Sequence, residues 1–339
     1  MKRKNSFAKF VCTALFLLLA ASISVVPSVS YAGDTVTLKA VTAFPKNALV
    51  NRALPDLIKM IEKRSDGRLK INYVGGPEVV QSFDQGEALR RGTIDMILYT
   101  PFGYLKSFSP ALQAKGLSSL TPWEERDAGV HDIWDKICQE KIGVKYLGTI
   151  HSVIDFHIYT NKKVEKMADF KGLKIRAMPL YTPFIKELGA KPIIIPPADV
   201  YTAMQRGVVD GYMFTTDFEI PDWGWQEVTK YKISPGVFQL ENATLMNLKK
   251  YNSLPDDLKD ILQHCVEVFE GVDTVRILQR KDKAWEEMQE AGVSEIFLPS
   301  DEAETYVKTA YEATWETIIK EDPEYGPKLK ELVSKPAKK

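Results

Sequence analysis

Between residues 35 and 100 the apolar positions recur first at strand spacing and then at helix spacing. The segment TVTLKAVTAF at 35–44 predicts a strand, because apolar and polar residues alternate along it. Apolar residues recur at helical intervals over 48–67, where Gly67 stands at a C-cap position. Ranges 68–74, 78–92 and 93–100 then predict a strand, a helix and a strand. The order strand-helix-strand-helix-strand is typical of a mostly parallel sheet covered by helices.

The same rhythm restarts after Ile150. We predict strands at 155–161, 171–178, 191–197 and 208–214, with helices at 179–190 and 198–207. A helical pattern then runs to about Gly292 from near Asp256, on the order of 50 Å at 1.5 Å per residue. Because this length exceeds one small domain, we expect the helix to lie across two domains. A further helix is predicted at 301–320.

One short element occurs in both halves of the chain, as EALRRGTIDMI from Glu87 and as TAMQRGVVDGY from Thr202. Each copy ends a helix and then places a Gly and an Asp before an apolar strand. Gly suits the left-handed residue that ends a helix, and Asp suits the turn that follows. We therefore interpret the repetition as a sign of architecture rather than of chemistry.

The 339 residues suggest two domains. We predict two α/β domains with mostly parallel sheets around a central ligand cleft. The first comprises 33–153 and 241–280, and the second comprises 154–240 and 281–339. The long C-terminal helix is expected to span both.

The first 32 residues resemble a secretory signal peptide. A basic start precedes an apolar run, and the small residues SYA at 30–32 predict cleavage after Ala32. An uncleaved anchor is the alternative, since the run approaches ~18 residues. The polar segment GDTVTLKA that follows favours cleavage. The 45 basic and 45 acidic residues balance, and removing four basic residues leaves a mature net charge of about −4. No basic tract with interleaved aromatic residues is present, so no nucleic-acid partner is expected.

The common catalytic signatures are absent from the sequence. It contains no GxGxxG after the first strand, no GxxxxGK[ST], no HExxH, no CxxC and no GxSxG. The four histidines share no ligand spacing, so neither a metal nor a cofactor is expected. Cys138 and Cys265 could pair after export, but their apolar helical settings favour buried thiols. Export combined with these absences favours a cleft that binds rather than reacts.

The most informative segment is MADFKGLKIRAMPLYTPFIKELGAKPIIIPPADVYTAMQRGVVDGY, at 167–212. It resembles the solute-binding proteins of TRAP transporters, whose pattern runs D-L-K-G-L-K-I-R, then L-G-A-x-P, then E-V-Y-x-A-L-Q-x-G-V-V-D-G. GGPEVVQSFDQGEALRRGTIDM is a weaker match in the first half. The resemblance implies a periplasmic binding protein, expected to be a monomer, that closes by hinges near Ser152 and Leu240. It also implies delivery of the ligand to a TRAP membrane permease.

The resemblance assigns the ligand carboxylate to Arg176, the last residue of KIR. The position fits physically, because ligands of open α/β sheets bind beyond the carboxyl ends of strands and a guanidinium offers two parallel donors. The chain departs from relatives at Phe156, where sialic-acid-type members carry a second Arg. Phe214 stands where many members have polar residues. We expect a single carboxylate and a less polar, aromatic or branched body; the alternative is that both Phe side chains pack the core.

Further candidates lie at predicted strand ends or near a helix start. The first-domain candidates are Phe44, Glu78, Gln81, Tyr99 and Phe102, and the second-domain candidates are Met178, Thr215 and Asp217. Trp223 and Trp225 fit a pocket wall or plain packing equally well.

Two alternatives use the same cleft. One is an exported enzyme with Glu78, Asp217 or His157 as its acid or base, although a lone His on a strand is usually structural. The other is a sensory ligand-binding protein. The sequence alone does not name the ligand.

Overall fold

The computed structural model describes residues 35–150, 152–215 and 219–334, apart from the side chains of Leu49 and Thr215. The predicted signal peptide and its cleavage after Ala32 lie outside these ranges. Across the described ranges, every helix is too short or too polar to cross a lipid bilayer.

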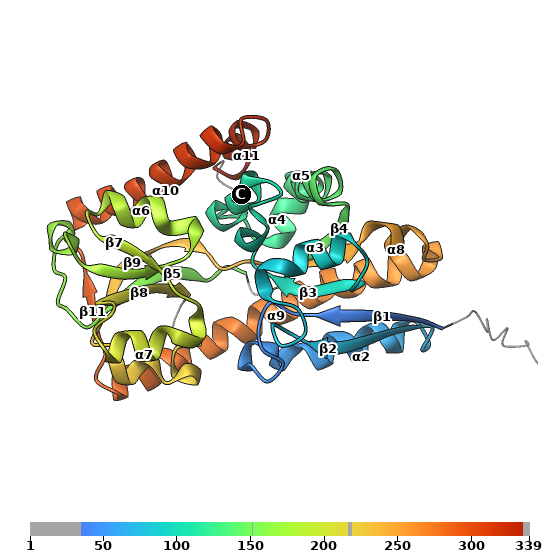
Figure 1. Cartoon of the computed structure of the whole chain (residues 1–339), viewed down its shortest axis with the longest axis horizontal. Coiled ribbons are helices and arrows are strands. Elements are labelled where there is room, and N and C mark those ends of the chain that lie inside the picture. The colour runs from blue at the N-terminus through green and yellow to red at the C-terminus, as the bar shows by residue number, and fades with distance from the viewer. Residues whose placement is uncertain (1–34, 151, 216–218, 335–339) are drawn as a thin grey trace, which may run out of the picture. The chain divides into compact units, whose positions relative to one another are not determined.

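The first sheet has the strand order β2-β1-β3-β10-β4 (Figure 1). Its strands are β1 (Val36–Val41), β2 (Leu69–Gly75), β3 (Met96–Thr100), β4 (Val144–Ile150) and β10 (Asn242–Asn247). Strand β1 is parallel to β2 and β3, whereas β10 is antiparallel to β3 and β4. The parallel part is the predicted strand-helix-strand series, with helices α2 (Leu54–Arg64) and α3 (Gln85–Arg90) between its strands.

The second sheet has the order β11-β9-β5-β8-β6-β7. Its strands are β5 (Asp155–Thr160), β6 (Lys174–Ala177), β7 (Lys191–Ile194), β8 (Gly211–Thr215), β9 (Tyr231–Gln239) and β11 (Ser294–Phe297). Helix α6 (Thr182–Glu187) and helix α10 (Ser300–Glu321) lie on one face, and α7 (Val200–Gln205) lies on the other (Figure 1). Strand β5 is antiparallel to both of its neighbours, β8 and β9.

These two sheets confirm the predicted fold class. The pairing is mixed rather than mostly parallel, because β5 and β10 run against their neighbours. The chain leaves the first sheet after β4 and returns to it as β10. Strand β10 lies between β3 and β4 and runs antiparallel to both. The residue boundaries given above for the two domains stay a prediction.

Helix α9 (Asp256–Glu290) is the predicted long helix. Its first half packs Leu258, Leu262 and Phe269 into a cluster with residues of the first sheet, such as Leu38. Its last turns place Met288 in a different cluster with residues of the second sheet. One helix therefore buries apolar side chains against both sheets, and this tertiary packing favours helix formation over its whole length.

Several shorter helices were not predicted. They are the 3-10 helix η4 (Pro110–Leu117), α4 (Pro122–Asp127), α5 (Val130–Ile137), α8 (Leu248–Asn252) and α11 (Gly326–Val333). Helix α4 begins with a capping box, in which the Glu124 N–H donates to Thr121 Oγ1 and the Thr121 N–H donates to Glu124 Oε2. Helix α10 packs against both α11 and η4.

The repeated element has one architectural role in both sheets. Gly92 and Gly207 follow α3 and α7 with φ of 73° and 67°, the left-handed conformation expected after a helix. Asp95 Oδ2 accepts from the Lys39 N–H at 2.8 Å, and Asp210 Oδ2 accepts from the Lys174 N–H at 2.9 Å. Each Asp N–H donates back to the carbonyl of the same Lys. Each Asp thus fixes the start of a buried strand against its parallel neighbour.

Cys138 and Cys265 are both buried free thiols. Helical packing in apolar surroundings therefore accounts for both residues.

Candidate ligand-binding site

The centre of the candidate site is Arg176 on β6. The strand lies between β7 and β8 in the second sheet, with Arg176 opposite Ile193 and Tyr212. Its neighbours Ile175 and Ala177 are buried, and Arg176 itself is 0% exposed. A short strand next to the edge strand of the sheet therefore carries a full positive charge into the interior.

Two backbone carbonyls hold the guanidinium in place. Arg176 Nε donates to the Ile195 carbonyl at 2.8 Å, and Nη1 donates to the Met213 carbonyl at 3.3 Å. Within the described residues Nη2 has no hydrogen-bond partner. The guanidinium carbon also lies 5.5 Å from the centre of the Phe214 ring. A buried cation with an unused donor is costly unless an anion completes it.

A small pocket of about 70 Å3 lies against this guanidinium. It is lined by Phe44, Pro101, Gly103, Tyr104, Phe156, Arg176, Met178, Pro179, Leu180, Tyr181, Pro197, Phe214, Glu219, Gln239, Leu240 and Glu241. Most of these side chains are apolar or aromatic. Burial raises the pKa of Tyr181, and the nearby Arg176 opposes that rise. The arrangement can enclose a small anion with an apolar body.

Five of the predicted residues come together at this pocket. They are Phe44, Phe156, Arg176, Met178 and Phe214. Phe156 and Tyr181 pack with ring centres 5.3 Å apart, so this part of the pocket wall is aromatic. Phe214 is both pocket wall and core, since its ring also packs 4.8 Å from that of Trp225.

Four other predicted residues do not line the pocket. The exposed Glu78 accepts backbone N–H bonds from Lys46 and Gly76 at 3.0 and 2.9 Å. Gln81 is exposed before a 3-10 turn, and the buried Tyr99 hydroxyl donates to Asn51. Phe102 packs its ring against Trp134 and Tyr146. Asp217 and the side chain of Thr215 lie outside the described part of the chain.

The remaining candidates are packing residues. Trp225 is buried against Tyr212 and Phe214, and Trp223 lies next to it, behind the pocket wall. His157 is buried, and its Nδ1 lies 3.0 Å from the Ile233 carbonyl. Burial lowers the pKa of His157 to about 3, so the ring is neutral at physiological pH. Neither Glu78 nor His157 is placed to act as an acid or base in this pocket.

The sequence analysis missed Tyr104, Tyr181, Glu219 and Glu241. Glu241 is buried between β9 and β10, and both of its carboxyl oxygens accept from the Phe102 N–H at 3.1 Å. Burial raises the pKa of Glu241 to about 8. The hydrogen bond from the Phe102 N–H and the positive charge of Lys115 partly oppose this rise. For Glu241, the only signal in the sequence was an acidic residue between two apolar segments. No group of His, Cys, Asp and Glu within the described residues could hold a metal ion.

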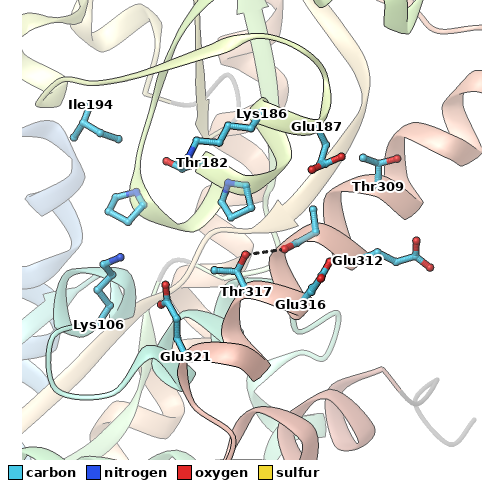
Figure 2. A pocket seen from close by; sticks show the side chains of 13 residues that line it. Lys106, Thr182, Lys186, Glu187, Ile194, Thr309, Glu312, Glu316, Thr317 and Glu321 are labelled. Carbon is cyan, nitrogen blue, oxygen red and sulfur yellow. Dashed lines mark hydrogen bonds between the residues drawn. The ribbon is translucent and has the colours of Figure 1, made fainter.

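A larger groove of about 740 Å3 lies nearby, between α6 and α10. Its lining includes charged side chains of both helices, among them Lys186 and Glu187 of α6 and Glu312 and Glu316 of α10 (Figure 2). These charges are solvated, and exposed charges contribute little to binding. The small pocket, which holds the buried guanidinium, is therefore the better candidate site.

The glycine pair at the end of β2 sets the position of Phe44. Gly75 has φ of 146°, and a Cβ on Gly76 would lie 1.9 Å from the Phe44 carbonyl oxygen. We therefore expect Gly76→Ala to destabilise the protein by about 1–3 kcal/mol and to weaken ligand binding by displacing Phe44. Thermal unfolding and calorimetry would measure both effects.

Gly271→Ala is the matched control, because a Cβ there would meet nothing within 4 Å on helix α9. We expect this change to be neutral or to stabilise by about 0.5–1 kcal/mol. Equal melting temperatures for the two variants would contradict the proposed role of Gly76.

Comparisons with known proteins identify the family of this chain. The family model for bacterial extracellular solute-binding protein, family 7, matches residues 40–322. A Haemophilus influenzae protein is 28% identical over 195 residues, and the match covers 53% of this chain and 55% of that protein. The monocarboxylate 2-oxoacid-binding periplasmic protein of Nostoc sp. is 22% identical, with 78% of this chain and 74% of that protein covered.

The same fold occurs in a solved TRAP periplasmic solute-binding protein of Desulfovibrio salexigens, crystallised with orotic acid. The TM-score is 0.78 at 20% identity, and the match covers 88% of this chain and 97% of that one. This likeness extends over both sheets.

Proposed function

Because the chain belongs to bacterial extracellular solute-binding protein family 7, the receptor family of TRAP transporters, we propose that it is the periplasmic receptor of an importer for a small organic monocarboxylate. The observation that carries this proposal is the buried Arg176 guanidinium, whose Nη2 has no partner among the described residues. A ligand carboxylate would supply the missing acceptors and neutralise the charge. Two parallel N–H donors match a carboxylate better than one ammonium would.

The apolar lining supports a ligand with a single carboxylate. Arg176 is the only basic residue among those that line the pocket in the described chain, and Phe156 replaces a potential second one. Phe214, Met178 and Leu180 offer apolar surface for the body of the ligand. The Nostoc relative is named for 2-oxoacids and the Desulfovibrio structure holds orotate, both of which are carboxylates.

Delivery to a permease completes the proposed function. Hinge movement near Ser152 and Leu240 would close the two sheets on the ligand and expel water, which strengthens the ion pair. The closed receptor would then dock on the membrane subunits as a monomer. The family consists of receptors rather than enzymes, and the placement of Glu78 and His157 agrees with this.

Thermal unfolding of residues 33–339 against a panel of organic acids tests this proposal. The panel contains aliphatic mono- and dicarboxylates, 2-oxo acids and aromatic acids, and the protein is first stripped of bound ligand. We expect one class of small monocarboxylate, at ~100 times its dissociation constant, to add about 2.7 kcal/mol of stability. If no acid in the panel raises the melting temperature, the carboxylate assignment is wrong.

A further inference from the structure

Glu241 is a second buried ionisable group in the same pocket as Arg176. It lies between the end of β9 and the start of β10 and is 7% exposed. Both carboxyl oxygens share one donor, the Phe102 N–H, at 3.1 Å each. Among the described residues no other hydrogen bond to this carboxyl is present.

Among the described residues, no cation forms an ion pair with Glu241. Lys115, the basic group with the strongest influence on it, forms an ion pair with Glu125 at 2.5 Å, and both partners are buried. The Arg176 guanidinium is held toward carbonyls of the second sheet. A buried carboxylate normally needs several donors or a paired cation, and Glu241 has one shared N–H.

The acidic groups around the pocket also favour the neutral form of Glu241. Glu219 lines the same pocket and is 5% exposed, and Tyr104 and Tyr181 lie on its walls. Burial is the main cause of the raised pKa of Glu241, and the negative charge of Glu125 raises it further. A ligand carboxylate on Arg176 would bring one more negative charge into the pocket. Like charges in a low-dielectric site favour protonation of the weaker acid.

We propose that Glu241 enters the complex as a neutral carboxylic acid and donates its O–H to an oxygen acceptor in the body of the ligand. This inference rests on the proposed function, because it assumes that the ligand carboxylate occupies Arg176. It narrows the ligand class to small acids that carry a carbonyl or similar oxygen beside the carboxylate. The same skeleton with an ammonium group, or without the oxygen, would leave the O–H of Glu241 without an acceptor.

Four acids with one carbon skeleton test the preference: 2-oxobutanoate, 2-hydroxybutanoate, 2-aminobutanoate and butanoate. Calorimetry at pH 6.5 should show 2-oxobutanoate binding at least tenfold more tightly than 2-aminobutanoate and butanoate, with 2-hydroxybutanoate between them. Glu241→Leu should abolish the preference, and Glu241→Gln should restore most of it, because the amide keeps a donor. Glu316→Gln, in the solvated groove of Figure 2, is the control and should change nothing.

The pH dependence of binding is a second readout. The affinity of the parent for 2-oxobutanoate should fall as the pH rises past about 8, where Glu241 loses its proton, and should stay level in Glu241→Gln. Three results would overturn the inference. In the first, 2-aminobutanoate binds most tightly and Glu241→Gln loses that binding. In the second, all four probes bind equally and Glu241→Leu has no effect. In the third, no probe binds.

Stability without ligand supplies an independent test. The pKa of Glu241 is raised from 4.5 in the unfolded chain to about 8, so the folded protein holds a proton that the unfolded chain has released. The contribution of Glu241 to stability is therefore fully present below pH 4.5 and is lost as the pH rises to about 8. The melting temperature of the parent should fall relative to that of Glu241→Gln across this range. Parallel curves would mean that Glu241 is ionised in the folded protein, and the inference would be wrong.

The two proposals fail in different ways. If the acids bind with the same affinities to the parent and to the Glu241 variants, only the proposed role of Glu241 is wrong. If acids bind equally well to Arg176→Ala, the carboxylate anchor itself is wrong.

Discussion

Arg176→Ala is expected to weaken binding of the preferred acid by about two to four orders of magnitude, or about 3–5 kcal/mol. The ligand carboxylate would then be buried in a pocket with no other lining cation among the described residues. The loss includes the desolvation of the unpaired carboxylate as well as the missing hydrogen bonds. Calorimetry with the acid that gives the largest thermal shift would measure it.

Arg176→Lys separates charge from geometry. The ammonium keeps the positive charge, but it lacks the planar fork that bonds to the Ile195 and Met213 carbonyls and still offers Nη2 to a ligand. We expect an intermediate affinity. Arg206→Ala is the matched control, because Arg206 follows helix α7 in the same half of the chain and is exposed. Unchanged affinity in Arg176→Ala would contradict the proposed anchor.

Local sequence patterns predicted the elements that local interactions determine. Gly92 and Gly207 end helices in the left-handed conformation that only Gly adopts readily, so their position in the sequence was a sufficient signal. Asp95 and Asp210 bond to the backbone of the neighbouring strand, so the repeated motif indicated the parallel pairs correctly. The antiparallel strands β9 and β10 were not predicted, because they pair with β5, β3 and β4 far away in the sequence.

The candidate site shows the same limit. Arg176, Met178 and Phe214 lie at the carboxyl ends of strands that the pattern identified, where ligands of α/β sheets bind. On the side of the first sheet, Tyr99 and Phe102 pack in the interior and do not line the pocket. Tyr104 and Glu241 reach the pocket from connections whose path depends on the tertiary fold. No local spacing encodes that path.

A buried ion pair joins the long helix to the first sheet. Glu270 of α9 is 3% exposed, and Arg126 Nη1 donates to its Oε2 at 2.5 Å. Glu270 Oε1 also accepts from the Thr149 N–H at 2.7 Å, near the end of β4. A Cβ on Gly148 would lie 2.3 Å from that oxygen, so only Gly leaves room for the contact. One carboxylate therefore fixes the helix, the strand end and Arg126 together.

Glu270→Ala is expected to cost about 3–5 kcal/mol of stability, because it leaves the half-buried Arg126 without its main partner and the Thr149 N–H without an acceptor. Urea or thermal unfolding would measure this. Glu267→Ala is the control: Glu267 also contacts Arg126, at 3.5 Å, but its side chain is 41% exposed. That change should cost at most about 1 kcal/mol. Equal losses of stability in Glu270→Ala and Glu267→Ala would show that burial does not determine how much these contacts with Arg126 stabilise the protein. Because desolvation opposes every buried pair, the double change Arg126→Met with Glu270→Leu should recover most of the lost stability.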